Sequence, residues 1–320
     1  MSMQTGMGDR FAASPQQQHG WALFGAAATN LLRSHCIVEI DGPLDRDRLG
    51  AALRTVVGRH EALRTRLVVP DGWNVPVQLI ETNVDAGIRI IDGSTIDDAD
   101  LDGSLDALLD AMYADGALHL CLVSRLPQQH LLLASIAALY ADAASLAIFL
   151  SEIACAYAGE VFGEVTQYAD VAAWYSDLIE NDESATERYH WDDSVSPATL
   201  AAQLPFARSD RSDAFAAERV PVDLPTPSLR ALASSLGATL DDLLLATWML
   251  LIRRHAGESD IAVGALFDGR PYEEMARGIG PYASVLPIRC TVPDHASFAD
   301  LMHAVARERR QCAGCQEYFT

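Results

Sequence analysis

The stretch "HLLLASIAALYADAASLAIFL", residues 130–150, joins an apolar run to a helical pattern through a turn of small residues. The apolar run predicts a strand, and from Ser145 the apolar residues recur at helical spacing until Gly159, where we expect the helix to end. Asp142 is the only acidic residue of the stretch and lies at the turn between them, flanked by alanines. The stretch is therefore an active site, a core, or the remains of an active site.

The segments on either side alternate between strand and helix patterns, which predicts an α/β (α+β two-layer) fold. A polar stretch with little periodicity, 191–218, separates two such series and is predicted to be a crossing linker. The halves would then be 1–190 and 219–320. The main predicted strands are 34–42, 117–126, 260–267 and 284–292, and helices are expected after the capping residues Asp45, Thr239 and Ser297.

Composition excludes several classes of protein. The net charge of −21 over 320 residues argues against a nucleic-acid binder, which needs a basic face. No apolar run reaches the roughly 18 to 20 residues of a membrane span, and the N-terminus lacks the pattern of a signal peptide. We expect a cytoplasmic protein with its six cysteines reduced. The acidic stretch 92–110 is predicted to be a solvated surface helix and its loop.

Few residues suggest chemistry by themselves. Cys312 and Cys315 form a single C-x-x-C without a second pair of ligands, which favours two cysteines at a helix end over a zinc or redox site. His60 lies at the end of a predicted helix, where a cationic side chain suits the helix dipole. The glycine-rich and serine-nucleophile signatures of phosphate-binding proteins and hydrolases are absent. No metal site is predicted.

Five short motifs, taken in order, resemble those of the condensation domains of nonribosomal peptide synthetases, which are relatives of chloramphenicol acetyltransferase. They extend over nearly the whole chain. The motifs are "SPQQQHGW" (14–21), "EIDGPLDRDRLGAALRTVVGRHEALRTRL" (39–67), "YADVAAW" (168–174), "GALFDGRPYEEM" (264–275) and "IGPYASVLPIR" (279–289).

The resemblance implies two acetyltransferase-like halves arranged as a V, with a tunnel that receives the phosphopantetheine arms of carrier proteins. The family's motif H-H-x-x-x-D-G aligns with "AALYADA", residues 137–143. Asp142 matches the aspartate, and Ser145 matches the serine that follows it. The two histidines are replaced by Ala137 and Ala138, and the glycine by Ala143.

In the family, condensation joins an amine to a carrier-bound thioester, and the second histidine holds or deprotonates the amine and stabilises the oxyanion. Alanine neither accepts a proton nor donates a hydrogen bond, so the replacement would remove this function. Tyr140 is not expected to take over the role of the lost histidine. Asp142 is mostly architectural in the family, and Arg64 is the candidate for its ion-pair partner. The residues expected to line the tunnel are Ala138, Tyr140, Ser145 and Ser284.

Two more departures accompany the lost histidines. Ser284 and Val285 occupy the positions of an asparagine–threonine pair, and the chain ends where a sizeable part of the family's second half would follow. We therefore expect the second half to be incomplete.

The resulting hypothesis is a condensation-like pseudoenzyme of a nonribosomal peptide pathway, which docks a peptidyl carrier protein or a tailoring enzyme. The alternatives are a residual amide-forming acyltransferase acting on carrier-bound thioesters, and a nonfunctional synthetase fragment. Another chain could complete the second half. No bound cofactor is expected apart from the phosphopantetheine arm of a partner carrier, and neither nucleic acid nor membrane is expected as a partner.

Overall fold

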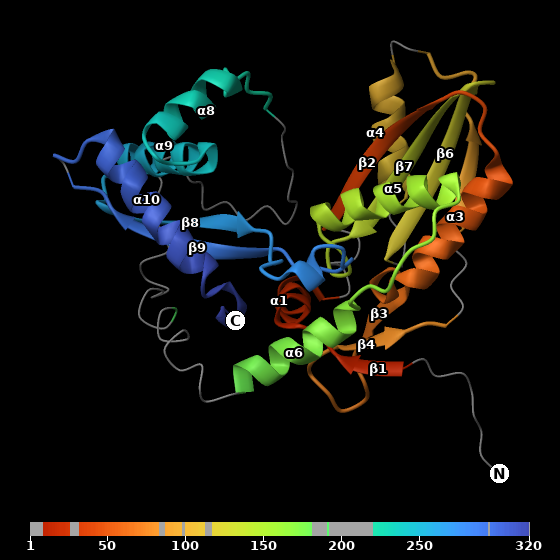
Figure 1. Cartoon of the computed structure of the whole chain (residues 1–320), viewed down its shortest axis with the longest axis horizontal. Helices are drawn as coiled ribbons and strands as arrows, with labels where there is room; N and C mark the ends of the chain where they lie inside the picture. The colour runs from red at the N-terminus through yellow and green to blue at the C-terminus, as the bar shows by residue number, and fades with distance from the viewer. Residues whose placement is uncertain are drawn as a thin grey trace. The chain divides into compact units, whose positions relative to one another are not determined.

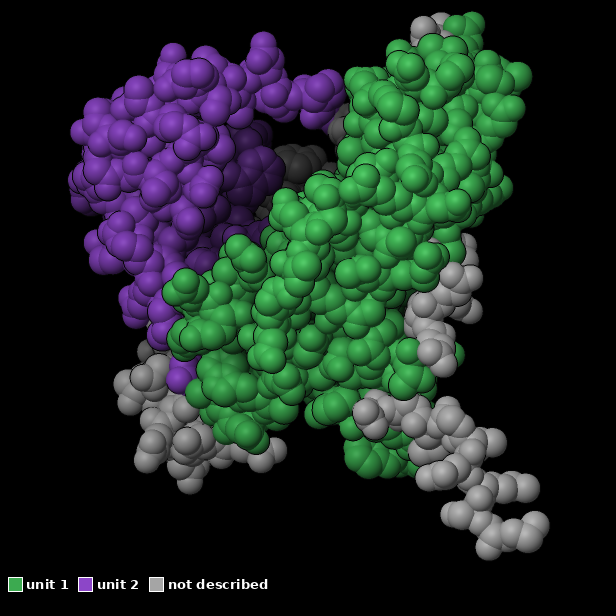
Figure 2. All heavy atoms as spheres, turned by 45° about the vertical axis from the view of Figure 1, so that its right-hand side comes forward, with its two compact units in different colours: residues 1–181, 268–283, 320 green, residues 182–267, 284–319 purple. Residues whose placement is uncertain are grey.

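The computed structural model describes residues 9–25, 32–82, 87–97, 100–112, 117–180, 191, 220–293 and 295–319. The chain divides into two compact units, coloured separately in Figure 2. Unit 1 comprises 1–181, 268–283 and residue 320, and unit 2 comprises 182–267 and 284–319. The predicted linker, 191–218, lies outside the described residues except for Trp191. The division into 1–190 and 219–320 therefore stays a prediction, to which the structure adds that 268–283 groups with unit 1.

The larger sheet of unit 1 has the strand order β2-β7-β6-β5 (Figure 1). Its strands are antiparallel except for the parallel pair β5 and β6. Helices pack on both faces of this sheet, which explains why β7 is a continuous apolar run rather than an alternating one. The elements are β2 (Arg33–Asp41), β5 (Ile88–Asp92), β6 (Leu118–Leu126), β7 (Gln129–Ala137), α3 (Arg46–Arg59), α4 (Leu101–Ala111) and α5 (Ala143–Ala158).

Successive residues of β6 belong to two different cores. Leu120 and Leu122 pack in a cluster with residues of α3 and α5. Cys121 and Val123 pack with residues of α4 on the opposite face. The acidic helix predicted at 92–110 is present as α4, which buries only Leu105 and Leu109 and leaves its aspartates exposed.

A smaller sheet of unit 1 has the order β1-β4-β3, all antiparallel. Helix α6 contacts β1 of this sheet, and α1 contacts α6. Ser14 caps α1 through a capping box with Gln17. The elements are β1 (Asp9–Ala12), α1 (Pro15–Phe24), η2 (Glu61–Arg64), β3 (Thr65–Val68), β4 (Val77–Ile80), α6 (Tyr168–Glu180) and η5 (Glu273–Met275).

Unit 2 contains an antiparallel strand pair and three α-helices among its described residues. Its core includes Met249 from α9, Leu286 from β9 and Val305 from α10. The predicted caps Thr239 and Ser297 both form capping boxes. The elements are α8 (Thr226–Ser235), α9 (Leu240–Ala256), β8 (Asp260–Phe267), β9 (Ser284–Thr291), α10 (Phe298–Ala313) and η6 (Gln316–Tyr318).

Length and apolar composition decide whether a helix could cross a membrane. In the part of the chain that the structure describes, no single helix is long and apolar enough to cross a membrane. The bent pair α8 and α9 meets the criterion together, with an angle of 94° between the helices.

Candidate functional site

The turn between β7 and α5 contains residues 137–143, which were predicted to match the family's catalytic motif. Ala137 is fully buried at the end of β7, packed in a cluster with Leu67, Leu139 and Tyr140. Ala138 is half-buried, and its N–H donates to the carbonyl of Leu32 at 2.7 Å. The two alanines therefore differ in surroundings: one is part of the core, and the other lies in a partly accessible turn.

Asp142 is the N-cap of α5. Its Oδ1 accepts from the backbone N–H of Ser145 at 2.8 Å and lies 2.8 Å from the Ser145 hydroxyl. The helix consequently begins at Ala143, two residues before the start predicted from the apolar spacing, because the carboxylate satisfies a free N–H of the first turn. The predicted end at Gly159 is confirmed, with that residue in the left-handed conformation at φ 90°.

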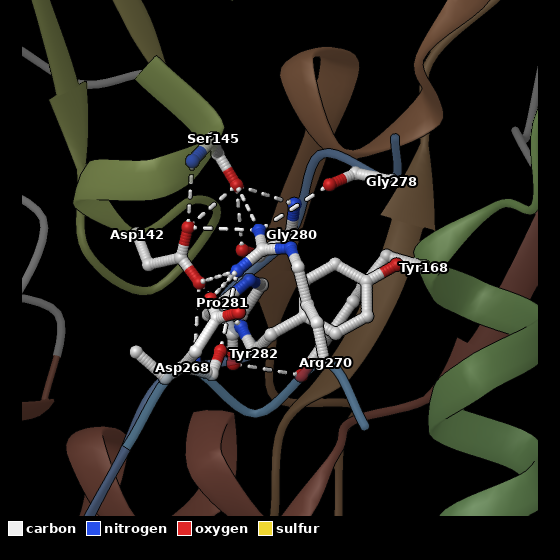
Figure 3. Close-up of polar contacts among 10 residues, drawn as sticks. Asp142, Ser145, Tyr168, Asp268, Arg270, Gly278, Gly280, Pro281 and Tyr282 are labelled. Carbon is white, nitrogen blue, oxygen red and sulfur yellow. Dashed lines mark hydrogen bonds and ion pairs between the residues drawn. The ribbon is translucent and has the colours of Figure 1, made fainter. Parts of the chain in front are cut away.

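Arg270 is the ion-pair partner of Asp142 (Figure 3). The guanidinium is bidentate, with Nη1 2.8 Å from Oδ2 and Nη2 2.9 Å from Oδ1. The two side chains are only 4% and 9% exposed. Burial alone would lower the pKa of Arg270, but the hydrogen bonds and charge of Asp142 outweigh it and raise that pKa. The guanidinium also lies 4.2 Å from the centre of the Tyr282 ring.

Backbone groups of segment 268–283 complete this arrangement. The N–H groups of Tyr282 and Ala283 donate to Asp142 Oδ2 at 3.2 and 3.0 Å. The Ser145 hydroxyl accepts from Gly280 N at 3.0 Å and lies 2.9 Å from Gly280 O. We call Asp142, Ser145, Arg270, Gly280 and Tyr282 the Asp142 cluster. It fastens segment 268–283 to the first turn of α5.

Two glycines permit the close approach of that segment. Gly269 has φ +71°, and a Cβ there would lie 1.9 Å from the carbonyl oxygen of Tyr282. A Cβ at Gly280 would lie 2.1 Å from the ring of Tyr168. Gly269 and Gly280 therefore both exclude a side chain.

Tyr168, which Gly280 approaches, is itself held inside unit 1. Burial raises the pKa of Tyr168 well above its ordinary value, and its hydroxyl lies 2.7 Å from Ser14 Oγ.

The predicted pairing of Asp142 with Arg64 is wrong. Arg64 lies at the end of η2, where Nη1 donates to the carbonyl of Glu81 at 2.8 Å and Nη2 lies 3.4 Å from Glu61 Oε1. Sequence reasoning missed Arg270 although it belongs to a quoted motif, "GALFDGRPYEEM". The sequence signal that could have indicated Arg270 as a partner of Asp142 is that it is the one arginine of this motif.

The residues predicted to line a tunnel have different surroundings. Tyr140 is 4% exposed, and its hydroxyl accepts from Leu67 N at 3.2 Å. Ser145 is fully buried in the Asp142 cluster. Ala138 and Ser284 are half-buried, in unit 1 and unit 2 respectively. The tunnel, its lining and its access by a phosphopantetheine arm stay predictions.

Two other candidates from the sequence have internal roles. His60 is the C-cap residue of α3 but is 1% exposed, and its Nε2 lies 2.7 Å from Glu152 Oε2. Burial lowers the pKa of His60 more than Glu152 raises it, which disfavours the cation expected at this helix end. Cys312 is buried, with its pKa raised to about 12 mainly by burial. No cluster of metal-ligating side chains occurs among the described residues.

Comparison with known proteins identifies the family. The model of the condensation domain matches residues 9–318, so this chain belongs to the condensation-domain family. Tyrocidine synthase 3 of Brevibacillus parabrevis is 26% identical over 303 residues, which cover 88% of this chain and 4% of that protein. Surfactin synthase subunit 1 of Bacillus subtilis (strain 168) is 29% identical over 289 residues, covering 87% and 8%. The chain thus spans less than a tenth of either relative.

Solved structures confirm the predicted fold class. The condensation domain from the Monacolin K polyketide synthase MokA matches with a TM-score of 0.81 at 19% identity, covering 98% of this chain and 75% of that one. The X-domain from teicoplanin biosynthesis matches with a TM-score of 0.75 at 22% identity, covering 98% and 72%. The mixed helix and sheet architecture is therefore that of a condensation domain.

Proposed function

We propose that this chain is a noncatalytic condensation-type domain of a nonribosomal peptide pathway that docks a carrier protein or recruits a tailoring enzyme. One observation carries the proposal. The Asp142 cluster, which supports the turn, is intact, whereas the two histidine positions are Ala137 and Ala138. The scaffold has thus kept its support and lost the groups that the family's chemistry requires.

The remaining polar side chains of the turn offer no replacement. Tyr140, Asp142 and Ser145 are the polar residues between 137 and 145, and all three are buried with internal hydrogen bonds. General acid–base catalysis contributes about 10²- to 10⁴-fold to a rate. Freeing any of these groups would require breaking the contacts that hold the turn. We therefore expect amide formation to be slower by at least this factor than in a domain with both histidines.

Recruitment is a use that this scaffold supports. A structural neighbour is described as a complex of the X-domain and OxyB from teicoplanin biosynthesis, and it matches this chain with a TM-score of 0.75 at 21% identity. By that description, an X-domain whose fold is similar to that of this chain forms a complex with OxyB. The resemblance of fold motivates the proposal without identifying a partner.

The test is binding to the proteins encoded beside this chain. Each carrier protein, in its phosphopantetheine-loaded form, and each tailoring enzyme would be titrated against the purified protein by calorimetry. Saturable binding to at least one of them is the expected result. Absence of binding to all of them would refute the recruiting role.

A residual acyltransferase is the second candidate, because positioning alone can supply much of a rate enhancement and the Asp142 cluster still shapes the turn. The unmodified protein and an Ala138→His/Ala143→Gly variant would be assayed for amide formation beside an intact homologue. Turnover by the unmodified protein close to that of the homologue would establish this second function instead. A nonfunctional fragment would fail both assays.

A further inference from the structure

Unit 1 has an open hollow of about 540 Å³ between α6 and η5, and the residues that line it do not include members of the Asp142 cluster. Both elements belong to the same unit, so the hollow does not depend on the placement of unit 2. We call it the α6–η5 pocket, and the lining residues that matter here are Asp170, Val171, Trp174, Tyr272, Glu274 and Met275.

Aromatic rings form one side of the α6–η5 pocket. The rings of Trp174 and Tyr272 meet edge to face, with centroids 5.6 Å apart and planes at 88°. Trp174 also packs on Tyr175, which is 2% exposed and so restrains the indole. Tyr272 is 46% exposed and belongs to the surface, whereas Val171 and Met275, which also line the pocket, are buried. The pocket therefore offers aromatic faces on a well-packed base.

Two carboxylates accompany the rings. Asp170 and Glu274 are exposed, and within the described ranges neither side chain forms an ion pair or hydrogen bond. Their negative charge repels anions, and the net charge of −21 attracts cations over a longer range. A purely apolar ligand would desolvate the carboxylates without giving them a partner, which is costly.

A guanidinium satisfies both features at once. It is planar and stacks on aromatic rings, it is always charged, and it can bond a carboxylate through two N–H groups. A lysine ammonium has the charge without the planar surface. We propose that the α6–η5 pocket binds an arginine side chain from a basic segment of a partner protein. The existence of such a partner rests on the proposed recruiting role, whereas the preference for arginine rests on the residues of the pocket.

The first test uses a capped five-residue peptide whose central arginine has a leucine on each side. A second peptide has citrulline in place of the arginine, because citrulline keeps the shape of the side chain without its charge. The full chain is titrated with each peptide while the indole N–H resonance of Trp174 is followed by NMR, assigned with Trp174→Phe. We expect a saturable shift with the arginine peptide and binding of the citrulline peptide weaker by roughly tenfold. Equal affinities, or no saturable shift with either peptide, would overturn the proposal.

The second test separates the pocket carboxylates from general acidity. Glu274→Gln should weaken binding of the arginine peptide by about three- to fivefold, whereas Glu273→Gln, on the same turn but outside the pocket lining, should leave the affinity within about twofold of the unmodified chain. Equal effects of the two variants would count against the pocket.

The same variants separate this proposal from the recruiting role. A pathway protein that binds the unmodified chain should lose affinity for Asp170→Asn/Glu274→Gln. Undiminished binding would remove the pocket as the docking site and leave recruitment standing. Arginine-peptide binding without any pathway partner would instead refute recruitment while the preference of the pocket for arginine stands.

Discussion

Replacing Arg270 with methionine isolates the ionic contribution of the Asp142 cluster, because methionine retains much of the aliphatic stem. The change leaves Asp142 buried, at 9% exposure, without its counter-ion. Removing one partner of a buried ion pair typically costs about 3–5 kcal/mol. Asp142 would keep hydrogen bonds from Ser145 and from the N–H groups of Tyr282 and Ala283, so we expect the lower end, about 3 kcal/mol.

Hydrogen exchange measured by mass spectrometry reports this cost locally. If segment 268–283 opens more easily by about 3 kcal/mol, its amides should exchange roughly a hundredfold faster wherever exchange follows this opening. Arg289→Met is the matched control, since Arg289 pairs with Asp260 with both side chains 35% exposed. A pair this exposed should contribute no more than about 1 kcal/mol.

A double variant checks the origin of the effect. Asp142→Asn/Arg270→Met removes the uncompensated charge, so segment 268–283 should regain part of the protection lost in Arg270→Met alone. Exchange of this segment that changes by less than about fivefold in Arg270→Met, or no more than in Arg289→Met, would refute the reasoning.

Three further predictions concern packing, the histidine positions and pH. Gly269→Ala should destabilise unit 1 more than the control Gly72→Ala when unfolding by urea is measured. Both glycines have positive φ, at +71° and +81°, but of the two only Gly269 would bring its Cβ against a backbone carbonyl oxygen. The control should therefore cost only about 1 kcal/mol. Ala137→His should cost about 2 kcal/mol or more because the position is 0% exposed. Ala138→His should cost less than about 1 kcal/mol because its position is half-buried, and equal unfolding midpoints for the two variants would contradict this contrast. Burial lowers the pKa of His60 below its ordinary 6.5, so the unfolded chain binds a proton that the folded chain does not, and stability should fall as the pH decreases below that value. His60→Gln should flatten this dependence when urea midpoints are compared at about pH 7.5 and about pH 5.5; an unchanged slope would show that another group titrates.

Local patterns in the sequence predicted most of the elements correctly. Asp45, Thr239 and Ser297 each cap a helix as expected, since capping depends on residues at most three positions apart. Periodicity also predicted the strands around residues 34–42 and 260–267, present as β2 and β8. The error at the start of α5 has a similarly local cause: the cap at Asp142 extends this helix beyond its apolar face.

The site was predictable only in part, because its decisive contact is not local. Asp142 and Ser145 could be aligned from the motif, but Arg270 lies 128 residues from Asp142 in the sequence. No periodicity connects two residues so far apart, and Arg64 was an equally charged candidate. Sequence alone likewise could not separate Ala137 from Ala138, since their difference in burial arises from tertiary packing.

The membership of segment 268–283 in unit 1 affects how this chain can be recombined with its relatives. The polypeptide passes from unit 1 to unit 2, returns to unit 1 for this segment, and then enters unit 2 again. A chimera with one splice site between the halves would therefore join Asp142 of one parent to Arg270 and Gly269 of the other. Exchange of residues 268–283 together with residues 1–181 requires three junctions.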